Sequence, residues 1–301
     1  MPLGYDKRIY IMAFDHRGSF KKLFGISGTP TPEEKARIQD GKMLIFEGLE
    51  RAIGEGASRD CAGVLVDEEF GADVARKAKA EGFPFAMPVE KSGQDEFDFE
   101  YGDEFGKHIE EFDPTFAKVL VRSNPDWDPD MNKAQFARLK YLSDWLHDRD
   151  RRFLYELLVP ATPEQLAGVG GDEGRYDTEA RPKLMLRSIE DAQDSGIDPD
   201  IWKIEGLDSS ETCAEIVALV QRDGRTNVGC VVLGRGADDA AVEGWLRAGA
   251  KVPGYLGFAI GRSIFNDSVK GIAQGTMERS EATRRISQKY RHFIDVYEGR
   301  A

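Results

Sequence analysis

Eight short segments rich in apolar and β-branched residues recur along the 301-residue chain, and segments with helical character lie between them. Strands that alternate with helices pair in parallel, and eight strands are the number that closes a parallel sheet into a barrel. We therefore predict an α/β fold, a single (β/α)8 TIM barrel that takes up residues 1–301 as one domain. The eight segments span residues 8–14, 61–67, 83–89, 116–121, 152–159, 200–205, 228–233 and 255–260.

The helical segments carry recognisable start signals, such as Thr31 before Pro32 and the hydroxyl of Ser209 before an apolar-periodic stretch. The predicted helices span residues 32–53, 72–81, 132–148, 179–195, 210–223, 238–248 and 263–274. An extra C-terminal helix is predicted from about 278 to 297, and its apolar residues fit either the floor of its own barrel or a second subunit. A doubly wound open sheet is the rival fold, but residues 14–19 lack the glycine-rich dinucleotide turn that it needs.

Glycines and acidic residues cluster at 167–178, between the fifth strand and its helix. A loop of this length is typical of a mobile lid, and a plain surface loop fits the composition equally well.

Charge and composition narrow the classes of partner. The chain has 41 basic and 54 acidic residues, a net charge of −13, which argues against nucleic acid or an anionic membrane as a partner. An anionic substrate therefore needs a local basic pocket. The apolar runs are shorter than the ~20 residues of a membrane span, and the N-terminus lacks a signal-peptide core, so we expect a soluble, cytoplasmic protein. Cys61, Cys213 and Cys230 are scattered, which predicts buried thiols rather than a disulfide framework or a zinc site.

Two lysines stand inside predicted strands. Barrel enzymes hold their chemistry at the C-terminal ends of the strands, so polar residues at these ends or within the strands are the candidates for function. Lys203 shares the inward face of the sixth strand with Ile201 and Glu205. Burial removes the hydration of an amine and favours its neutral form, which is nucleophilic toward carbonyls, although a solvated lysine at a strand edge is the plainer interpretation. Lys118 lies on the same face of the fourth strand as Leu120 and Arg122, so it is a second inward lysine. If one of the two lysines stays charged, it lowers the pKa of the other amine and keeps that amine reactive. The spacing leaves open which lysine is the nucleophile.

Carboxylates accompany these lysines at the strand ends. Glu156 lies in so apolar a segment that it must point inward, where desolvation favours its protonated form unless a cation offsets the effect. We predict a general acid–base there, with a structural ion pair to a core lysine as the alternative. Asp15 can accept a hydrogen bond from a substrate hydroxyl, whereas His16 fits a loop residue. Glu90 and Glu205 are candidates for binding hydroxyls or pairing with the lysines.

Glycine and arginine follow the last two strands, where barrels commonly bind phosphate through backbone amides and a guanidinium. We predict that substrate or phosphate is bound by Gly234, Arg235, Gly236, Gly261, Arg262, Arg122 and Glu90.

Taken in order, six segments of the chain resemble the class I, Schiff-base aldolases related to tagatose-1,6-bisphosphate aldolase. The segments are residues 14–19, 63–68, 118–121, 156–158, 202–205 and 257–265. Within that group the chain is most similar to the aldolase domain of inositol catabolism, which cleaves 2-deoxy-5-keto-gluconate 6-phosphate to dihydroxyacetone phosphate and malonate semialdehyde. The likeness runs over nearly the whole chain, but 122–126 lacks the aromatic or histidine of close relatives and 234–236 is more basic than usual.

The resemblance implies Lys203 as the imine-forming residue, Glu156 as the acid–base, and Asp15 and Lys118 as supporting polar groups, with Arg262 and nearby amides on phosphate. We expect a carbon–carbon lyase that acts on a phosphorylated keto-sugar, without metal or cofactor, either alone or as a homo-oligomer. Two alternatives remain. One is a transaldolase-like enzyme or other phosphosugar lyase with Lys118 as nucleophile, and the other is a non-catalytic sugar-phosphate sensor.

Overall fold

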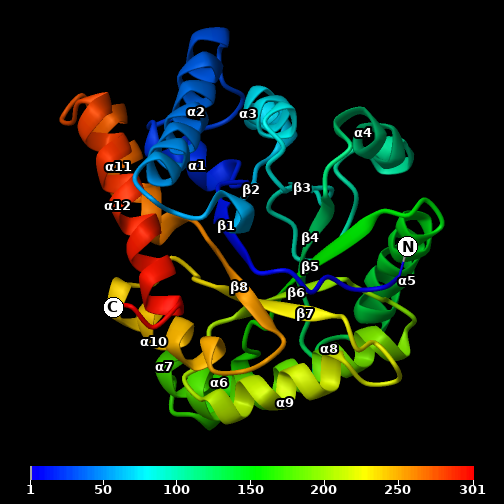
Figure 1. Ribbon diagram of the computed structural model, residues 1–301. Helices are drawn as coiled ribbons and strands as arrows, with labels where there is room; N and C mark the ends of the chain where they lie inside the picture. The colour runs from blue at the N-terminus through cyan, green and yellow to red at the C-terminus, as the bar shows by residue number, and fades with distance from the viewer. Residues whose placement is uncertain (1) are drawn as a thin grey trace.

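The computed structural model describes residues 2–301, and its eight strands form one closed parallel barrel in the order β1 to β8. Figure 1 shows the helices arranged around the outside of these strands. The predicted (β/α)8 TIM barrel is confirmed. The strands are β1 (Ile9–Ala13), β2 (Ala62–Leu65), β3 (Phe85–Pro88), β4 (Phe116–Arg122), β5 (Arg152–Leu158), β6 (Ile201–Glu205), β7 (Gly229–Leu233) and β8 (Tyr255–Ile260).

The helices include every segment predicted as helical and some that were not. The α-helices are α1 (Gly18–Leu23), α2 (Pro32–Gly54), α3 (Glu68–Ala80), α4 (Phe105–Phe112), α5 (Pro129–His147), α6 (Pro163–Gly168), α7 (Glu173–Arg175), α8 (Arg181–Asp194), α9 (Ser210–Val220), α10 (Asp239–Ala250), α11 (Arg262–Ala273) and α12 (Arg279–Tyr297). Short 3-10 turns lie at η1 (Arg59–Cys61) and η2 (Gly102–Glu104), and a π-helix at η3 (Tyr176–Ala180). The sequence prediction omitted α1, α4, α6 and α7, of which α4 has the clearest signal, Phe105, Ile109 and Phe112 at helical spacing.

The residues predicted to start helices cap them in the structure. Thr31 forms a capping box with Glu34 at the start of α2, and Ser209 accepts a hydrogen bond from the Thr212 amide at the start of α9. The predicted loop at 167–178 was wrong in part. Its second half is helical, because Asp172 caps the first turn of α7 and the chain continues through η3 into α8.

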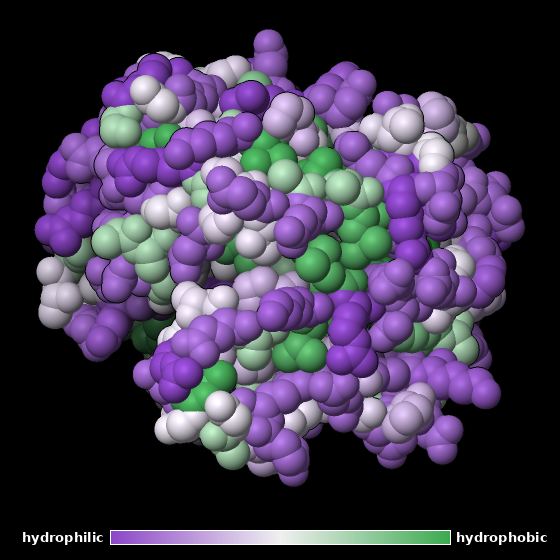
Figure 2. All heavy atoms as spheres, turned by 90° about the horizontal axis from the view of Figure 1, so that it is seen from below, coloured by the Kyte–Doolittle hydropathy of each residue, from purple (hydrophilic) through white to green (hydrophobic). Residues whose placement is uncertain are grey.

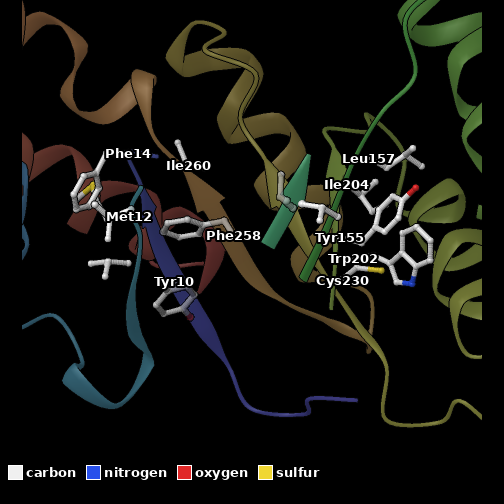
Figure 3. Packing of buried hydrophobic residues seen from close by; sticks show 14 of the residues in the cluster. Tyr10, Met12, Phe14, Tyr155, Leu157, Trp202, Ile204, Cys230, Phe258 and Ile260 are labelled. Carbon is white, nitrogen blue, oxygen red and sulfur yellow. The ribbon is translucent and has the colours of Figure 1, made fainter. Parts of the chain in front are cut away.

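Strand alternation divides the apolar residues into two sets. One set fills the barrel interior, with Ile11, Leu154 and Ile201 among its members. The other set faces outward and packs against the helices. Figure 3 shows part of it, including Tyr10, Met12, Tyr155, Trp202, Ile204 and Phe258. Because side chains alternate along a strand, the residue two positions after Ile201 also points inward, and this residue is Lys203. The polar side chains near the C-terminal ends of the strands therefore lie directly above an apolar barrel interior.

The C-terminal helix α12 covers the outer wall of its own barrel, and the predicted position on the barrel floor was wrong. Tyr290 donates a hydrogen bond to the carbonyl of Tyr10 at 2.7 Å, and Tyr297 donates to the carbonyl of Tyr255 at 2.9 Å. These bonds fix the helix outside β1 and β8. It also packs closely on α2, where a Cβ atom placed on Gly48 would lie 2.4 Å from Ile286.

Hydrophilic residues make up most of the face shown in Figure 2, with hydrophobic residues in groups between them. Within residues 2–301, the helices are too short or too polar to cross a bilayer.

Candidate active site

Glu156 is the shared partner of the two inward lysines. It is paired in register with Lys203 across β5 and β6, so both side chains leave the barrel wall at one level. The Oε2 atom of Glu156 lies 3.0 Å from the Nζ atom of Lys203 and 2.9 Å from the Nζ atom of Lys118. One carboxylate oxygen therefore bridges two amines at the C-terminal end of the barrel.

Lys118 is enclosed by carboxylates. Its Nζ atom donates to Asp15 at 2.8 Å and to Glu90 at 2.9 Å, in addition to the contact with Glu156, and its side chain is 1% exposed. Burial by itself would lower the pKa of Lys118, but Asp15, Glu156 and Glu90 outweigh burial and raise that pKa well above its usual value. Lys118 is therefore an ammonium ion at neutral pH.

Burial raises the pKa of each of the three carboxylates in the cluster, but the nearby cations reverse that shift in only two of them. Burial would raise the pKa of Asp15, but Lys118 and Lys203 outweigh it and lower that pKa. The pKa of Glu156 is lowered in the same way, by the same two lysines, so the cations offset the desolvation expected from its apolar segment. Burial raises the pKa of Glu90 despite Lys118 and Arg17. Glu156 is thus a carboxylate at neutral pH.

Two further cations hold this arrangement and were missed in the sequence. Arg17 donates to the backbone carbonyl of Glu90 at 2.7 Å and to the carboxylate of Glu100 at 2.8 Å. Lys42 reaches from α2 with a fully buried side chain, and it donates to Asp67 at 2.6 Å, to the carbonyl of His16 at 2.8 Å and to the carbonyl of Phe14. These bonds fix the backbone on both sides of Asp15. The sequence pattern could have indicated Lys42, because it follows Ile38 by four residues and therefore lies on the apolar face of its helix.

Glu205 takes no part in the lysine cluster, contrary to one of the roles considered for it. Its carboxylate accepts a hydrogen bond from the Val159 amide at 2.9 Å and pairs with Arg181 at 3.3 Å and with Arg235 at 3.2 Å. Glu90 does pair with a lysine, as one of its predicted roles required.

Two cavities open beside Glu156. The lysine cavity, of about 410 Å³, is lined by Asp15, Glu90, Lys118 and Lys203 together with residues of the loop after β3. The arginine cavity, of about 590 Å³, is lined by Arg235, Arg262, Tyr176 and Asp177 and by residues that follow β5. The residues that line both cavities are His16, Ser19, Leu120, Arg122 and Glu156. A ligand with its reactive carbon at Glu156 can therefore extend toward the arginines.

Some of the residues predicted to bind phosphate line a cavity, whereas others only pack against the neighbouring strands. Arg235 and Arg262 line the arginine cavity, and the Nη2 atom of Arg262 donates to the carbonyl of Arg235 at 2.7 Å. Gly236, with a φ of 76°, lines an outer cavity of about 690 Å³ that Arg262 also borders. Gly261 packs against the backbone, because a Cβ atom there would lie 1.9 Å from the carbonyl oxygen of Ala13.

The two remaining residues predicted to bind phosphate, Gly234 and Arg122, lie close to other parts of the chain. A Cβ atom on Gly234 would lie 3.1 Å from Ile260, so this glycine admits a neighbouring side chain. Arg122 donates from Nη1 to the carbonyl of Gln94 at 2.7 Å and stands where the two cavities meet.

His16 borders both cavities, although the sequence suggested an ordinary loop residue. Burial lowers the pKa of His16 to about 4, against the opposing effect of Asp15. Its imidazole is therefore neutral at pH 7. The other histidines contact carboxylates elsewhere, as His108 does with Glu68. In the part of the chain from residue 2 to residue 301, no group of three or more His, Cys, Asp or Glu side chains is arranged to hold a metal ion. All the cysteines are free thiols, and the predicted burial holds for Cys213 and Cys230 but is wrong for Cys61, which is partly exposed.

Solved structures with this fold include aldolases. A fructose-bisphosphate aldolase from Plasmodium falciparum, solved in complex with TRAP and an inhibitor, matches with a TM-score of 0.63 and 15% identity over 99% of this chain and 92% of that chain. A Schiff base-forming fructose-1,6-bisphosphate aldolase matches with a TM-score of 0.53 and 14% identity over 93% of each chain. Cgl0159 from Corynebacterium glutamicum matches with a TM-score of 0.54 and 16% identity over 96% of this chain and 88% of its own. At such identities these likenesses show a common fold.

The search of curated proteins gives no match to this sequence. The model of one protein family, described as "Uncharacterized protein conserved in bacteria (DUF2090)", matches residues 4–301. The chain therefore belongs to the DUF2090 family of bacterial proteins.

Proposed function

We propose that this protein is a class I aldolase that cleaves a phosphorylated keto-sugar through a Schiff base on Lys203. The observation that carries the proposal is the position of the Glu156 Oε2 atom, 3.0 Å from the Nζ atom of Lys203 and 2.9 Å from that of Lys118. A nucleophilic amine next to a positioned acid–base is the arrangement that imine formation requires. The aldolases among the structural neighbours have the same fold.

Lys203 is the better nucleophile of the two lysines. Lys118 has three carboxylate partners, which hold it in the ammonium form, and an ammonium nitrogen has no lone pair to attack a carbonyl. Lys203 has one close carboxylate partner, Glu156, and borders the lysine cavity. Lys118 then serves as the fixed positive charge of the site.

One proton transfer prepares both groups for the reaction. When a proton passes from the Nζ atom of Lys203 to Glu156, the amine becomes neutral and the carboxyl becomes an acid. The amine attacks the ketone carbon to form a carbinolamine. Glu156 then returns its proton to the carbinolamine hydroxyl, which leaves as water, and the protonated imine remains.

The imine accepts the electron pair of the carbon–carbon bond that breaks. As that bond breaks, the hydroxyl on the departing carbon loses its proton to Glu156 or Asp15 and becomes an aldehyde. The enamine left on Lys203 is reprotonated at carbon, and water hydrolyses the imine to release dihydroxyacetone phosphate and the free amine. Each proton taken up by a carboxylate is returned within the cycle.

Arginine side chains offer hydrogen-bond donors to an anionic substrate in this pocket, beside the acidic residues Glu156, Glu173, Asp177 and Glu205 that also line it. The chain as a whole carries a net charge of −13, but Arg122, Arg235 and Arg262 all border the arginine cavity. We propose that Arg235 and Arg262 bind the phosphate with amides of the neighbouring turns. As the particular substrate we propose 2-deoxy-5-keto-gluconate 6-phosphate of inositol catabolism, which would give dihydroxyacetone phosphate and malonate semialdehyde. This follows from the resemblance to the aldolases related to tagatose-1,6-bisphosphate aldolase. We further propose a cytoplasmic enzyme without nucleic-acid or membrane partners, which acts either alone or as a homo-oligomer.

A cleavage assay over a panel of keto-sugar phosphates tests the proposal. We expect release of dihydroxyacetone phosphate from at least one of them, at a rate unaffected by a chelator. Lys203→Arg should abolish release, whereas Lys91→Arg, at the exposed rim of the same cavity, should retain it. Tight binding of phosphosugars without cleavage by the wild-type protein would favour the sensor. Cleavage that survives Lys203→Arg and fails in Lys118→Arg would favour a lyase with Lys118 as nucleophile.

A further inference from the structure

Two arginines and two carboxylates form a closed ring at the edge of the arginine cavity. Arg181 contacts Asp177 at 3.0 Å and Glu205 at 3.3 Å. Arg235 contacts Glu205 at 3.2 Å and donates from Nη1 to the other oxygen of Asp177. The charges alternate around the ring and sum to zero. The guanidinium of Arg235 is thus already neutralised by carboxylates of the protein itself.

The members of the ring differ in how firmly they are held. Glu205 and Arg181 have side chains that are 5% and 3% exposed, and Glu205 also accepts a hydrogen bond from the Val159 amide. Arg181 has a further acceptor in the carbonyl of Gly206 at 3.3 Å. Asp177 and Arg235 are 26% and 34% exposed, and both line the cavity. Asp177 is therefore the carboxylate that can leave the ring at the lowest cost.

The backbone around both exposed members is unusual. Asp177 lies on the π-helix η3 between α7 and α8, and π-helical turns occur frequently at functional sites. Arg235 has a φ of 53°, in the left-handed region that a non-glycine residue adopts at a cost. This backbone brings the guanidinium to Glu205 and Asp177.

We infer that the Asp177 carboxylate occupies the anion-binding position of Arg235, and that a phosphate monoester must displace it to bind. A phosphate dianion offers more charge and more acceptor oxygens than a carboxylate, so it replaces the bonds that Asp177 gives up. Glu205 stays in place and keeps Arg235 directed at the ligand. Asp177 is thereby an affinity-determining residue of the site. The inference takes its ligand class, a phosphate monoester, from the proposed function and does not depend on the imine.

Calorimetric titration with glycerol 3-phosphate tests the inference, because this probe has no carbonyl and cannot form an imine with Lys203. We compare the wild-type protein with Asp177→Asn, Glu179→Gln and Arg235→Gln. Glu179→Gln is the matched control: it makes the same change of charge on the same π-helix, and Glu179 is half exposed and pairs with Arg175 at 2.8 Å. Asp177→Asn retains the shape of the side chain while removing its charge.

We expect Asp177→Asn to bind glycerol 3-phosphate about fivefold more tightly than the wild type, since a partly exposed ion pair no longer competes. Glu179→Gln should stay within twofold of the wild type, and Arg235→Gln should lose binding. Hydrogen exchange at residues 173–180 should be faster in Asp177→Asn and should rise in the wild type when the probe binds. Affinity in Asp177→Asn equal to or weaker than that of the control, or an absence of binding to all four proteins, overturns the inference.

The titration with glycerol 3-phosphate tests the role of Asp177 independently of the proposed aldolase activity, which borohydride trapping of the imine tests. If borohydride traps no imine yet Asp177→Asn binds the probe more tightly than its control, the aldolase proposal fails and the anion site stands. If the imine is trapped and Asp177→Asn behaves as its control does, the aldolase proposal stands and the role of Asp177 is wrong.

Discussion

Lys203 and Glu156 are register partners on adjacent strands of the barrel, and their charged atoms lie 3.0 Å apart above an apolar floor. The register of a parallel pair is fixed by its backbone hydrogen bonds, so this distance is set by the barrel rather than by a flexible loop. A slip by one residue would turn one of the two side chains out toward the helices.

The first prediction concerns the charge of Lys118. Lys118→Met leaves Asp15, Glu90 and Glu156 without their common cation in a buried cluster. Loss of one partner from a buried ion pair costs about 3–5 kcal/mol, and we expect a fall of this size in the free energy of unfolding by urea. The double variant Lys118→Met/Glu90→Gln should recover part of the loss because one uncompensated charge is removed. Equal stabilities of the single and double variants would contradict the assigned network.

The second prediction concerns Lys42, which holds the backbone beside Asp15. Lys42→Met should lower kcat by about tenfold while leaving the imine on Lys203 trappable, because the loss acts through the position of Asp15. We expect the free energy of unfolding to fall by about 3 kcal/mol, since Asp67 loses its buried partner. Lys35→Met, on an exposed position of the same helix, is the control and should change neither quantity.

The third prediction is a pH dependence that arises from His16. Its pKa falls from 6.5 to about 4 in the folded protein because the partly buried imidazole is desolvated, which disfavours its charged form. Between these values the unfolded chain binds more protons than the folded one, so stability falls as the pH falls from 6.5 toward 4. The contribution is at most about 3.5 kcal/mol. Stability measured against pH should therefore decline less steeply for His16→Gln, and an NMR titration of the wild type should place the His16 midpoint well below 6.5. A His16 midpoint near 6.5 would contradict the desolvated, neutral imidazole.

The fourth prediction compares the effect on stability of two Gly→Ala changes, one where the new methyl group would clash with the backbone and one where it would meet open space. Gly261→Ala places a methyl group 1.9 Å from the carbonyl oxygen of Ala13, and we expect a loss of about 3 kcal/mol or more as β1 and β8 are forced apart. Gly244→Ala, on α10, has open space around the new methyl group and should stabilise the protein by about 0.5–1 kcal/mol. Thermal melts of both variants check the pair. Equal effects would contradict the close contact at the end of β8.

The barrel and its lysine cluster could be predicted because both follow from local patterns. The eight apolar segments define the strands, and the alternation of side chains along each strand directs Lys118, Glu156 and Lys203 to one interior. What the sequence did not disclose depends on contacts between distant segments. Lys42 looks like one more helical position until α2 is packed against the turn after β1. The ring of Asp177 and Arg235 joins residues 58 positions apart through a π-helix that local propensity does not signal.

The central claim is that Lys203 forms an imine while Lys118 remains charged. Borohydride reduction in the presence of dihydroxyacetone phosphate, followed by peptide mapping, tests it most directly. The account predicts one covalent adduct, on the peptide that carries Lys203, and none in Lys203→Arg, while Lys118→Arg should still be labelled at residue 203. An adduct on Lys118, or a wild-type protein that loses no activity and gains no mass on reduction, would contradict it.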